Sequence, residues 1–227
     1  MKKIAIIQSN YIPWKGYFHI IQKVDHFVFL DTAQYTCRDW RNRNLIKTPD
    51  GKKWLTVPTD GTQSKKINEV KIDNSTNWQY DHYQTLKHNY SCCEYYKDFI
   101  PLLDEIYMKK EWISLSELNQ YFIRKIAKIL NIKTQFHNSN EFILPPGKNE
   151  KIISIIHQMG GTHYVSGPSA ADYIKPELFE INGIDIEFMD YSNYLQYPQP
   201  WNEFIHGVTI LDLLFCTGSQ AAKYIWS

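Results

Sequence analysis

IAIIQSNYIPWKGYFHIIQKVDHFVFLDTAQYTCRDWRNRN, residues 4–44, is the part of the chain that determines the expected fold. The apolar run Ile4–Ile7 leads into a polar loop, a helix-like pattern from Trp14, and a second apolar run, Phe27–Leu30. This order predicts a strand–loop–helix–strand unit. Because open α/β sheets bind ligands beyond the carboxyl ends of their strands, we expect a functional site in the polar segments that follow the two runs.

The rest of the chain continues the alternation of strands and helices. The sequence predicts further strands at 54–58, 67–72, 134–137, 163–165 and 184–189. It predicts helices at 77–90 and 97–108, a long one from Ser116, others at 151–159 and 208–215, and a helical turn at 170–174. We therefore expect a single α/β domain over 1–227, with a Rossmann-like open, mainly parallel sheet and a mostly helical insertion at about 77–130.

Composition excludes several classes of protein. Hydrophobic residues make up 43% of the 227 residues, which is enough for a sizeable core and argues against disorder. The formal net charge of +1 argues against an extended nucleic-acid surface. No run approaches the roughly 18 apolar residues of a membrane span, and no signal peptide is evident. The 4 cysteines show no CxxC spacing. We expect a cytoplasmic protein with no membrane partner.

The first polar loop and the helix after it are candidates for ligand contact. Five side chains there are expected to bind substrate: Gln8, Asn10, Tyr11, Trp14 and Tyr17. A helix that starts just after a strand offers free N–H groups and a favourable dipole to anions. His19, in the same helix, is a candidate general base, although a half-buried helix histidine is an equally good interpretation.

The segment after the second strand is basic. It holds Arg38, Arg41, Asn42 and Arg43, and arginine binds phosphate and carboxylate through two parallel hydrogen bonds. A solvated basic loop is the structural alternative. The position at a strand end favours phosphate binding by this cluster, and Asp31, the residue that ends the strand, is a second candidate base.

Two later segments add binding candidates. Ser166, Gly167 and Ser169 lie in a turn whose backbone N–H groups suit an anion, with a serine nucleophile as the less favoured interpretation. Tyr197 and Gln199 lie in a proline-rich loop that suits either a sugar or base face or a packed surface. Asp212, inside an apolar helix, is either a structural partner or a buried acid. No histidine and carboxylate spacing forms a metal motif, so no metal is predicted beyond Mg²⁺ accompanying a nucleotide.

These segments, taken in order, resemble the WbqC-like family of bacterial proteins. The matching segments are 8–21, 31–44, 164–174, 197–199 and 211–218. The resemblance implies a transferase of an acyl or aminoacyl group, such as glycine, that acts on a nucleotide-linked amino sugar in surface-polysaccharide (O-antigen) synthesis. It implies a small-molecule partner, a nucleotide-linked sugar, and an activated acyl donor as co-substrate.

Two alternatives stay open at this point. Residues 13–19 partly resemble the HIGH-type nucleotidyltransferases, with His19 at the second histidine position and Tyr17 at the first, which implies adenylation or ligation with ATP and Mg²⁺. The other alternative is a non-catalytic protein that binds nucleotide sugars. The sequence names neither the acyl donor nor the oligomeric state.

Overall fold

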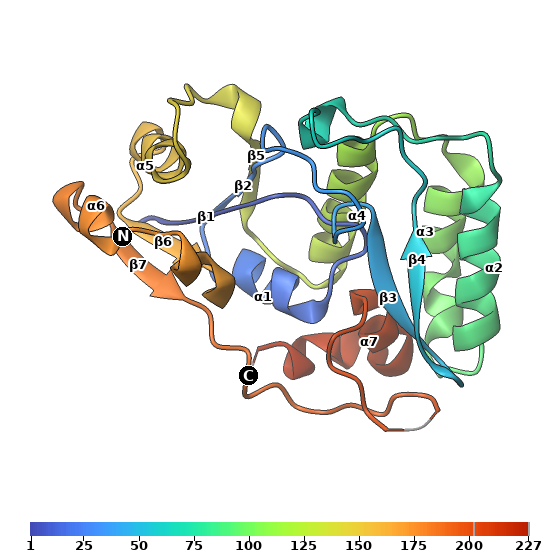
Figure 1. Cartoon of the computed structure of the whole chain (residues 1–227). Coiled ribbons are helices and arrows are strands. Elements are labelled where there is room, and N and C mark those ends of the chain that lie inside the picture. Colours follow the sequence, from blue (N-terminus) through green and yellow to red (C-terminus); the bar gives the residue numbers. More distant parts are fainter. Residues whose placement is uncertain (202, 227) are drawn as a thin grey trace.

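The chain folds into one parallel five-stranded sheet and one antiparallel hairpin, with helices packed around both (Figure 1). The structure is a computed structural model and describes residues 1–201 and 203–226. The strands are β1 Lys3–Ile7, β2 His26–Phe29, β3 Arg43–Thr48, β4 Gly51–Thr56, β5 Gln135–Asn138, β6 His163–Ser166 and β7 Asp185–Phe188. The helices are α1 Lys15–Gln22, α2 Trp78–Tyr90, α3 Ile100–Asp104, α4 Leu115–Ile129, α5 Lys148–Gln158, α6 Pro176–Ile181 and α7 Ile210–Thr217.

The main sheet confirms the predicted Rossmann-like α/β class. Its strand order is β5-β2-β1-β6-β7, and every adjacent pair is parallel. From the central strand β1 the sheet extends through β2 and β5 on one side and through β6 and β7 on the other. The order therefore reverses between β1 and β6, and such a switch point is where open α/β sheets leave a crevice for ligands.

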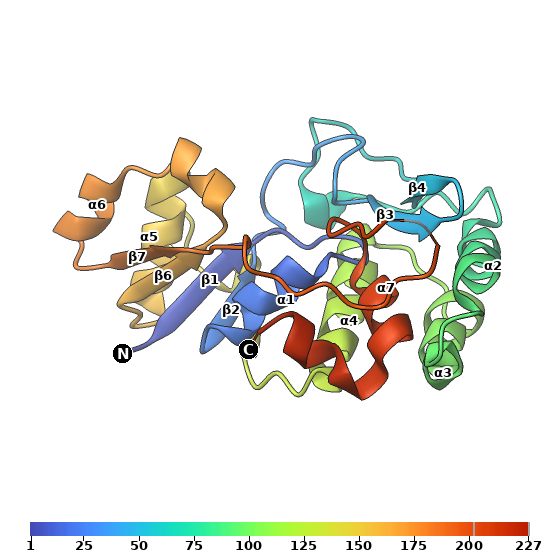
Figure 2. The ribbon, with the colours of Figure 1, turned by 90° about the horizontal axis from the view of Figure 1, so that it is seen from below.

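Side chains that alternate along the strands point into two separate cores. Ala5, Phe27 and Phe29 point to the face covered by α1, α4 and α7, while Ile6 and Val28 point to the face covered by α5 and α6. Figure 2, seen from below, places α1, α4 and α7 together on the first side. Burial on both faces explains why these strands are short, continuous apolar runs in the sequence.

The middle of the chain is mostly helical. Residues 78–129 hold α2, α3 and α4, and the 97–108 helix appears as a 3-10 turn at Tyr96–Phe99, α3, and a π-helical turn at Glu105–Lys109. The hairpin β3–β4 lies between this helical region and the sheet (Figure 1). Apolar residues of the hairpin, the insertion and the sheet share one core.

Three local predictions differ from the structure. Residues 67–72 are not a strand: Ile67–Glu69 is a 3-10 turn, and only single bridges follow it, Lys71 with Ser114 and Thr59 with Ile72. The Glu69 carboxylate accepts a hydrogen bond from the Lys66 N–H at 2.9 Å, which closes the turn. Strand β3 and helix α6 are absent from the prediction, and Arg43 lies in β3 rather than in a loop.

Candidate functional site

The polar loops that follow β1 and β2 are bound to each other. The Tyr11 N–H donates to the Trp40 carbonyl at 3.0 Å, and the Arg41 guanidinium donates to the Asn10 side-chain oxygen. The Asn44 amide donates to the carbonyl oxygens of Tyr11 and Ile12, both at 3.0 Å. Two segments that are some thirty residues apart therefore form one wall at the carboxyl edge of the sheet, as parallel strands require.

A cavity of about 350 Å³ opens at the switch point, beyond the ends of β1 and β6. We call it the switch-point cavity. It brings together seven of the predicted binding residues: Gln8, Trp14, Tyr17, Arg41, Ser166, Gly167 and Ser169. Its other lining residues are two tyrosines and four apolar side chains: Tyr173, Tyr191, Ile6, Ile7, Ile20 and Ala170. The sequence thus predicted the polar part of this cavity and omitted its two tyrosines.

Arg41 supplies the positive charge of the switch-point cavity. Its side chain is 14% exposed and is held by Asn10 and by Asp39, whose carboxylate lies 3.7 Å from Nη2. The Asn119 amide holds the Arg41 carbonyl from behind at 2.8 Å. Because both ends of the residue are fixed, the guanidinium is preorganised for an anion, which reduces the entropy lost on binding.

Three neutral tyrosines line the same cavity. The pKa of Tyr17 lies well above its ordinary value. Burial and the negative charge of Asp31 raise it, and the positive charge of Arg41 lowers it by a smaller amount. Burial also raises the pKa of Tyr173 and of Tyr191. All three phenols therefore keep their protons at neutral pH. The Tyr17 hydroxyl donates to the Gln8 carbonyl at 2.9 Å, which leaves its oxygen lone pairs as acceptors.

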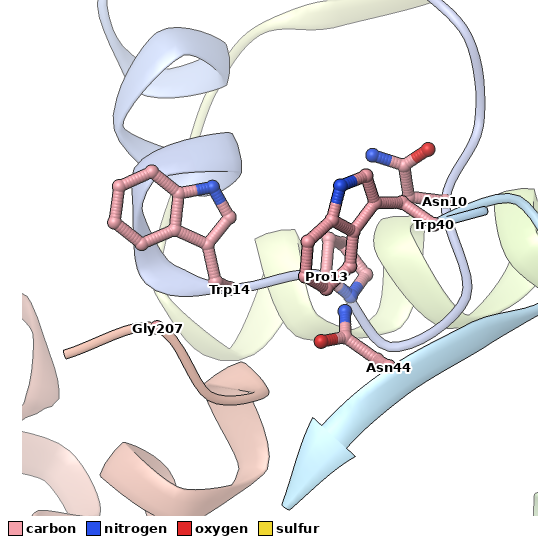
Figure 3. A pocket seen from close by; sticks show the side chains of 6 residues that line it. All are labelled: Asn10, Pro13, Trp14, Trp40, Asn44 and Gly207. Carbon is pink, nitrogen blue, oxygen red and sulfur yellow. The ribbon is translucent and has the colours of Figure 1, made fainter. Parts of the chain in front are cut away.

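A second cavity, of about 280 Å³, adjoins the first through Trp14 (Figure 3). Its lining residues are Asn10, Pro13, Trp14, Trp40, Asn44 and Gly207. Trp14 stacks edge-on against Tyr191 with ring centroids 5.0 Å apart. Trp40, which is 42% exposed, is absent from the predicted site. Its place in a polar run next to Arg41 is the signal that points to it.

Tyr11 and Asp31 line neither of these two cavities, and their side chains hold other parts of the fold in place. Tyr11 is fully buried, and its hydroxyl bonds His82 Nδ1 at 2.8 Å and the Tyr107 hydroxyl at 2.6 Å. Asp31 is also buried. Its carboxylate accepts from the Ser9 N–H at 2.8 Å, from the Ser116 hydroxyl and from the Gln120 amide at 3.0 Å. Because Asp31 lines neither of the two cavities described above, the geometry gives no support for its predicted role as a base.

The other members of the basic segment point elsewhere. Arg38 is exposed, with φ of 54°, and lines neither cavity. Arg43 lies over the Trp54 ring at 4.1 Å from its centroid. Asn42 is buried and donates to the Val57 carbonyl at 2.9 Å. The predicted cluster is therefore divided, and Arg41 is its member in the switch-point cavity.

Tyr197 and Gln199 belong to a buried network around Asp212. The Tyr197 hydroxyl and the Gln199 amide donate to Asp212 Oδ1 at 2.6 and 2.7 Å, and Tyr90 donates to Oδ2 at 2.9 Å. Burial nevertheless raises the pKa of Asp212. These bonds attach Tyr197 and Gln199 to α7, and the two predicted sugar contacts line neither cavity.

His19 lies on a side of α1 that faces the 191–194 segment. Its Nδ1 is 3.0 Å from the Tyr194 hydroxyl, and its ring also neighbours Trp226 at 6.4 Å between centroids. Burial and nearby Lys23 lower its pKa. His19 does not line the switch-point cavity, which removes the geometric basis for the predicted general base.

Within 1–201 and 203–226, no group of three or more His, Cys, Asp or Glu side chains could hold a metal ion. Over the same ranges, no helix has both the length and the apolar composition needed to cross a bilayer.

Comparisons with known proteins agree with this arrangement of segments. The model of the WbqC-like protein family matches residues 8–224, nearly the whole chain and all the residues that line the polar walls of both cavities. The chain is also 43% identical over 227 residues, 99% of its length and 98% of the relative's, to "Uncharacterized protein Rv1507c" of Mycobacterium tuberculosis (strain ATCC 25618 / H37Rv). No solved structure matches. The extent of the family match shows that the chain belongs to the WbqC-like protein family.

Proposed function

We propose that the protein is a transferase that acylates the amine of a nucleotide-linked amino sugar, with an acyl or aminoacyl group such as glycine, in surface-polysaccharide (O-antigen) synthesis. The observation that carries the proposal is the placement of Arg41 in a cavity at the switch point of a parallel sheet. A fixed guanidinium suits the diphosphate of a sugar nucleotide. No metal is invoked in this assignment.

The neighbours of Arg41 suit the sugar. Ser169 and the three neutral tyrosines offer hydroxyl groups to a polyol, and the indole of Trp14 offers an apolar face. Such a mixture of a few polar groups on an apolar wall is typical of small-molecule sites. The cavity of about 350 Å³ lies within the volume range of such sites.

The proposed acyl transfer is direct and requires no covalent intermediate on the protein. The amine nitrogen attacks the acyl carbonyl carbon of an activated donor, for example a thioester. The new C–N bond forms, the C–S bond breaks, and the thiol leaves with the proton that the amine loses. An amine with a pKa of about 8, like an α-amino group, is partly unprotonated at neutral pH, so positioning supplies much of the catalysis.

The test uses two arginines that carry the same charge and differ in place. UDP-glucosamine is incubated with acyl thioesters and aminoacyl donors, and the product mass is measured for the wild type, Arg41→Gln and Arg38→Gln. We expect an acylated product whose rate falls about 100-fold in Arg41→Gln, the loss of a charged contact worth about 3 kcal/mol. We expect Arg38→Gln to stay within twofold of the wild type. Unchanged substrate mass with every donor and several sugar nucleotides contradicts the proposal.

A further inference from the structure

The cavity that contains Asn10, the hydrogen-bond partner of Arg41, is bordered by two tryptophans. Two indoles, those of Trp14 and Trp40, lie on either side of it, and Pro13, Asn10 and Asn44 lie on the Trp40 side (Figure 3). We call it the tryptophan slot. Leaving a Trp side chain 42% exposed forgoes burial of a large apolar surface. Exposed aromatic side chains that border a cavity are typical of ligand contacts.

The tryptophan slot and the switch-point cavity are close enough for one ligand. Trp14 lines both, and Asn10, which lines the slot, accepts a hydrogen bond from Arg41, which lines the switch-point cavity. An anion on the Arg41 guanidinium therefore lies next to the slot opening. In a nucleotide, a ribose joins the phosphates to the base, so one ligand of this class has a group for each of the two cavities.

We propose that the tryptophan slot binds the nucleobase of a nucleoside diphosphate whose phosphates are held by Arg41. The inference rests on the proposed function and deepens it, because it assigns the base to Trp14 and Trp40. It also moves the base away from Tyr197 and Gln199, whose polar groups are used around Asp212.

The chemistry of the slot favours a base over an aliphatic group. Every nucleobase has a π-face that stacks on aromatic side chains, and stacking is tolerant of base identity. The Asn10 side-chain nitrogen makes no hydrogen bond within the described residues, so it is available to a ring carbonyl, a group that an alkyl chain lacks. The Asn44 side chain donates to the Tyr11 carbonyl and accepts from the Leu45 N–H. Both of its polar atoms are therefore bonded, and it forms a fixed wall.

Trp54 provides a matched control. It has an exposure of 39%, close to that of Trp40, and the two rings are in contact with centroids 5.3 Å apart. Trp54 does not line the slot, and the Arg43 guanidinium already covers its ring at 4.1 Å. Replacing either indole therefore removes a similar exposed apolar surface, and only Trp40→Ala removes a wall of the slot.

The experiment compares probes with and without a base by isothermal titration. The probes are UDP, dTDP, GDP, ADP and inorganic pyrophosphate, and the proteins are the wild type, Trp40→Ala, Trp40→Phe and Trp54→Ala. We expect the best nucleoside diphosphate to bind at least tenfold more tightly than pyrophosphate to the wild type. Trp40→Ala loses that tenfold advantage and keeps the pyrophosphate affinity. Trp40→Phe and Trp54→Ala stay within threefold of the wild type.

The outcomes separate this inference from the proposed function. Pyrophosphate that binds in an Arg41-dependent way, with no gain from any base, overturns the tryptophan slot and leaves the transferase proposal standing. Equal losses in Trp40→Ala and Trp54→Ala also overturn it, because they show a general surface effect. If none of the five probes binds, both fail. Decanoate is titrated in addition as an aliphatic control. If it binds tightly in a way that Trp40→Ala abolishes, and no probe with a base is preferred, the cavity is an acyl pocket and the inference is contradicted.

Discussion

At the scale of single residues, the three arginines of the basic segment occupy different environments because the backbone directs their side chains differently. Arg38, Arg41 and Arg43 are neighbours in the sequence, but only Arg41 lines the switch-point cavity. Composition and strand-end position predict that an arginine from this segment belongs to the site. They cannot select which one, because the choice depends on the start of β3 at Arg43 and on the left-handed backbone at Arg38.

Buried polar residues are the other limit of prediction at this scale. Tyr11, Tyr197 and Asp31 have the chemistry of ligand contacts, and in the fold their polar groups are hydrogen-bonded to other side chains or to the backbone. Burying such groups without partners costs free energy, so a folded chain pairs them internally. The partners, such as His82 or Asp212, lie far away in the sequence, and only the tertiary structure reveals them.

His19 yields a prediction at the same scale. Because its ring contacts Tyr194 and does not line the switch-point cavity, we expect His19→Gln to bind UDP within threefold of the wild type. We also expect no pyrophosphate release from ATP that depends on His19. Titration calorimetry and a pyrophosphate assay with candidate acids check both points. Pyrophosphate release by the wild type that His19→Gln abolishes would instead favour the adenylating alternative.

At the scale of elements, the strand–loop–helix–strand unit could be predicted because its signals are local. The apolar runs of β1 and β2 and the periodicity of α1 each lie within a few residues. Strand β3 is harder, since its alternation is hidden in the basic segment. The Pro49-Asp50-Gly51 turn that joins it to β4 is the signal for the hairpin. The 67–72 segment alternates like a strand but is closed locally by Glu69.

Gly16 of α1 leaves room for the indole of Trp14, which lines both cavities. A Cβ at this position of α1 would lie 2.3 Å from Cζ2 of the Trp14 indole, which folds back over the first helical turn. We expect Gly16→Ala to displace the indole and to weaken UDP binding about tenfold. The change in melting temperature stays small, because alanine is worth up to about 1 kcal/mol over glycine in a helix and offsets the strain.

The control for Gly16→Ala is the background without the indole. In Trp14→Ala the clash is gone, so adding Gly16→Ala should leave UDP affinity unchanged. A further tenfold loss in the double variant would show that Gly16 acts through the backbone rather than through Trp14.

At the scale of the whole molecule, one buried hydrogen-bond chain joins the site loop to the helical insertion. The Tyr11 hydroxyl bridges His82 of α2 and Tyr107 of the π-helical turn, and the Tyr11 backbone holds Trp40 and Asn44. The insertion therefore supports the loop that borders the tryptophan slot. This long-range coupling has no local signal in the sequence, since Tyr11 is 71 residues from His82 and 96 from Tyr107.

His82, a member of this hydrogen-bond chain, makes the stability of the protein depend on pH. Burial lowers the pKa of His82 from 6.5 to about 4. The unfolded state then binds more protons than the folded state between these values, so His82 makes stability fall as the pH drops below about 6.5. The loss attributable to His82 reaches about 2 kcal/mol at pH 5, as each pKa unit corresponds to about 1.4 kcal/mol.

Urea unfolding of the wild type and His82→Gln from pH 7.5 to pH 5 isolates this group from other titrating residues. We expect the stability advantage of the wild type to shrink by about 2 kcal/mol over that range. Parallel curves for the two proteins would show that the His82 ring does not titrate against folding.

The central claim is that the switch point of the sheet, beyond β1 and β6, is the substrate site. A crystal structure of the protein soaked with UDP-glucosamine tests it most directly. The account predicts density for the diphosphate within hydrogen-bond distance of the Arg41 guanidinium, with the sugar against Tyr17 and Ser169. Well-defined ligand density at another place, such as the polar cavity beside Asp31 and Gln120, with the switch-point cavity filled only by water, would contradict it.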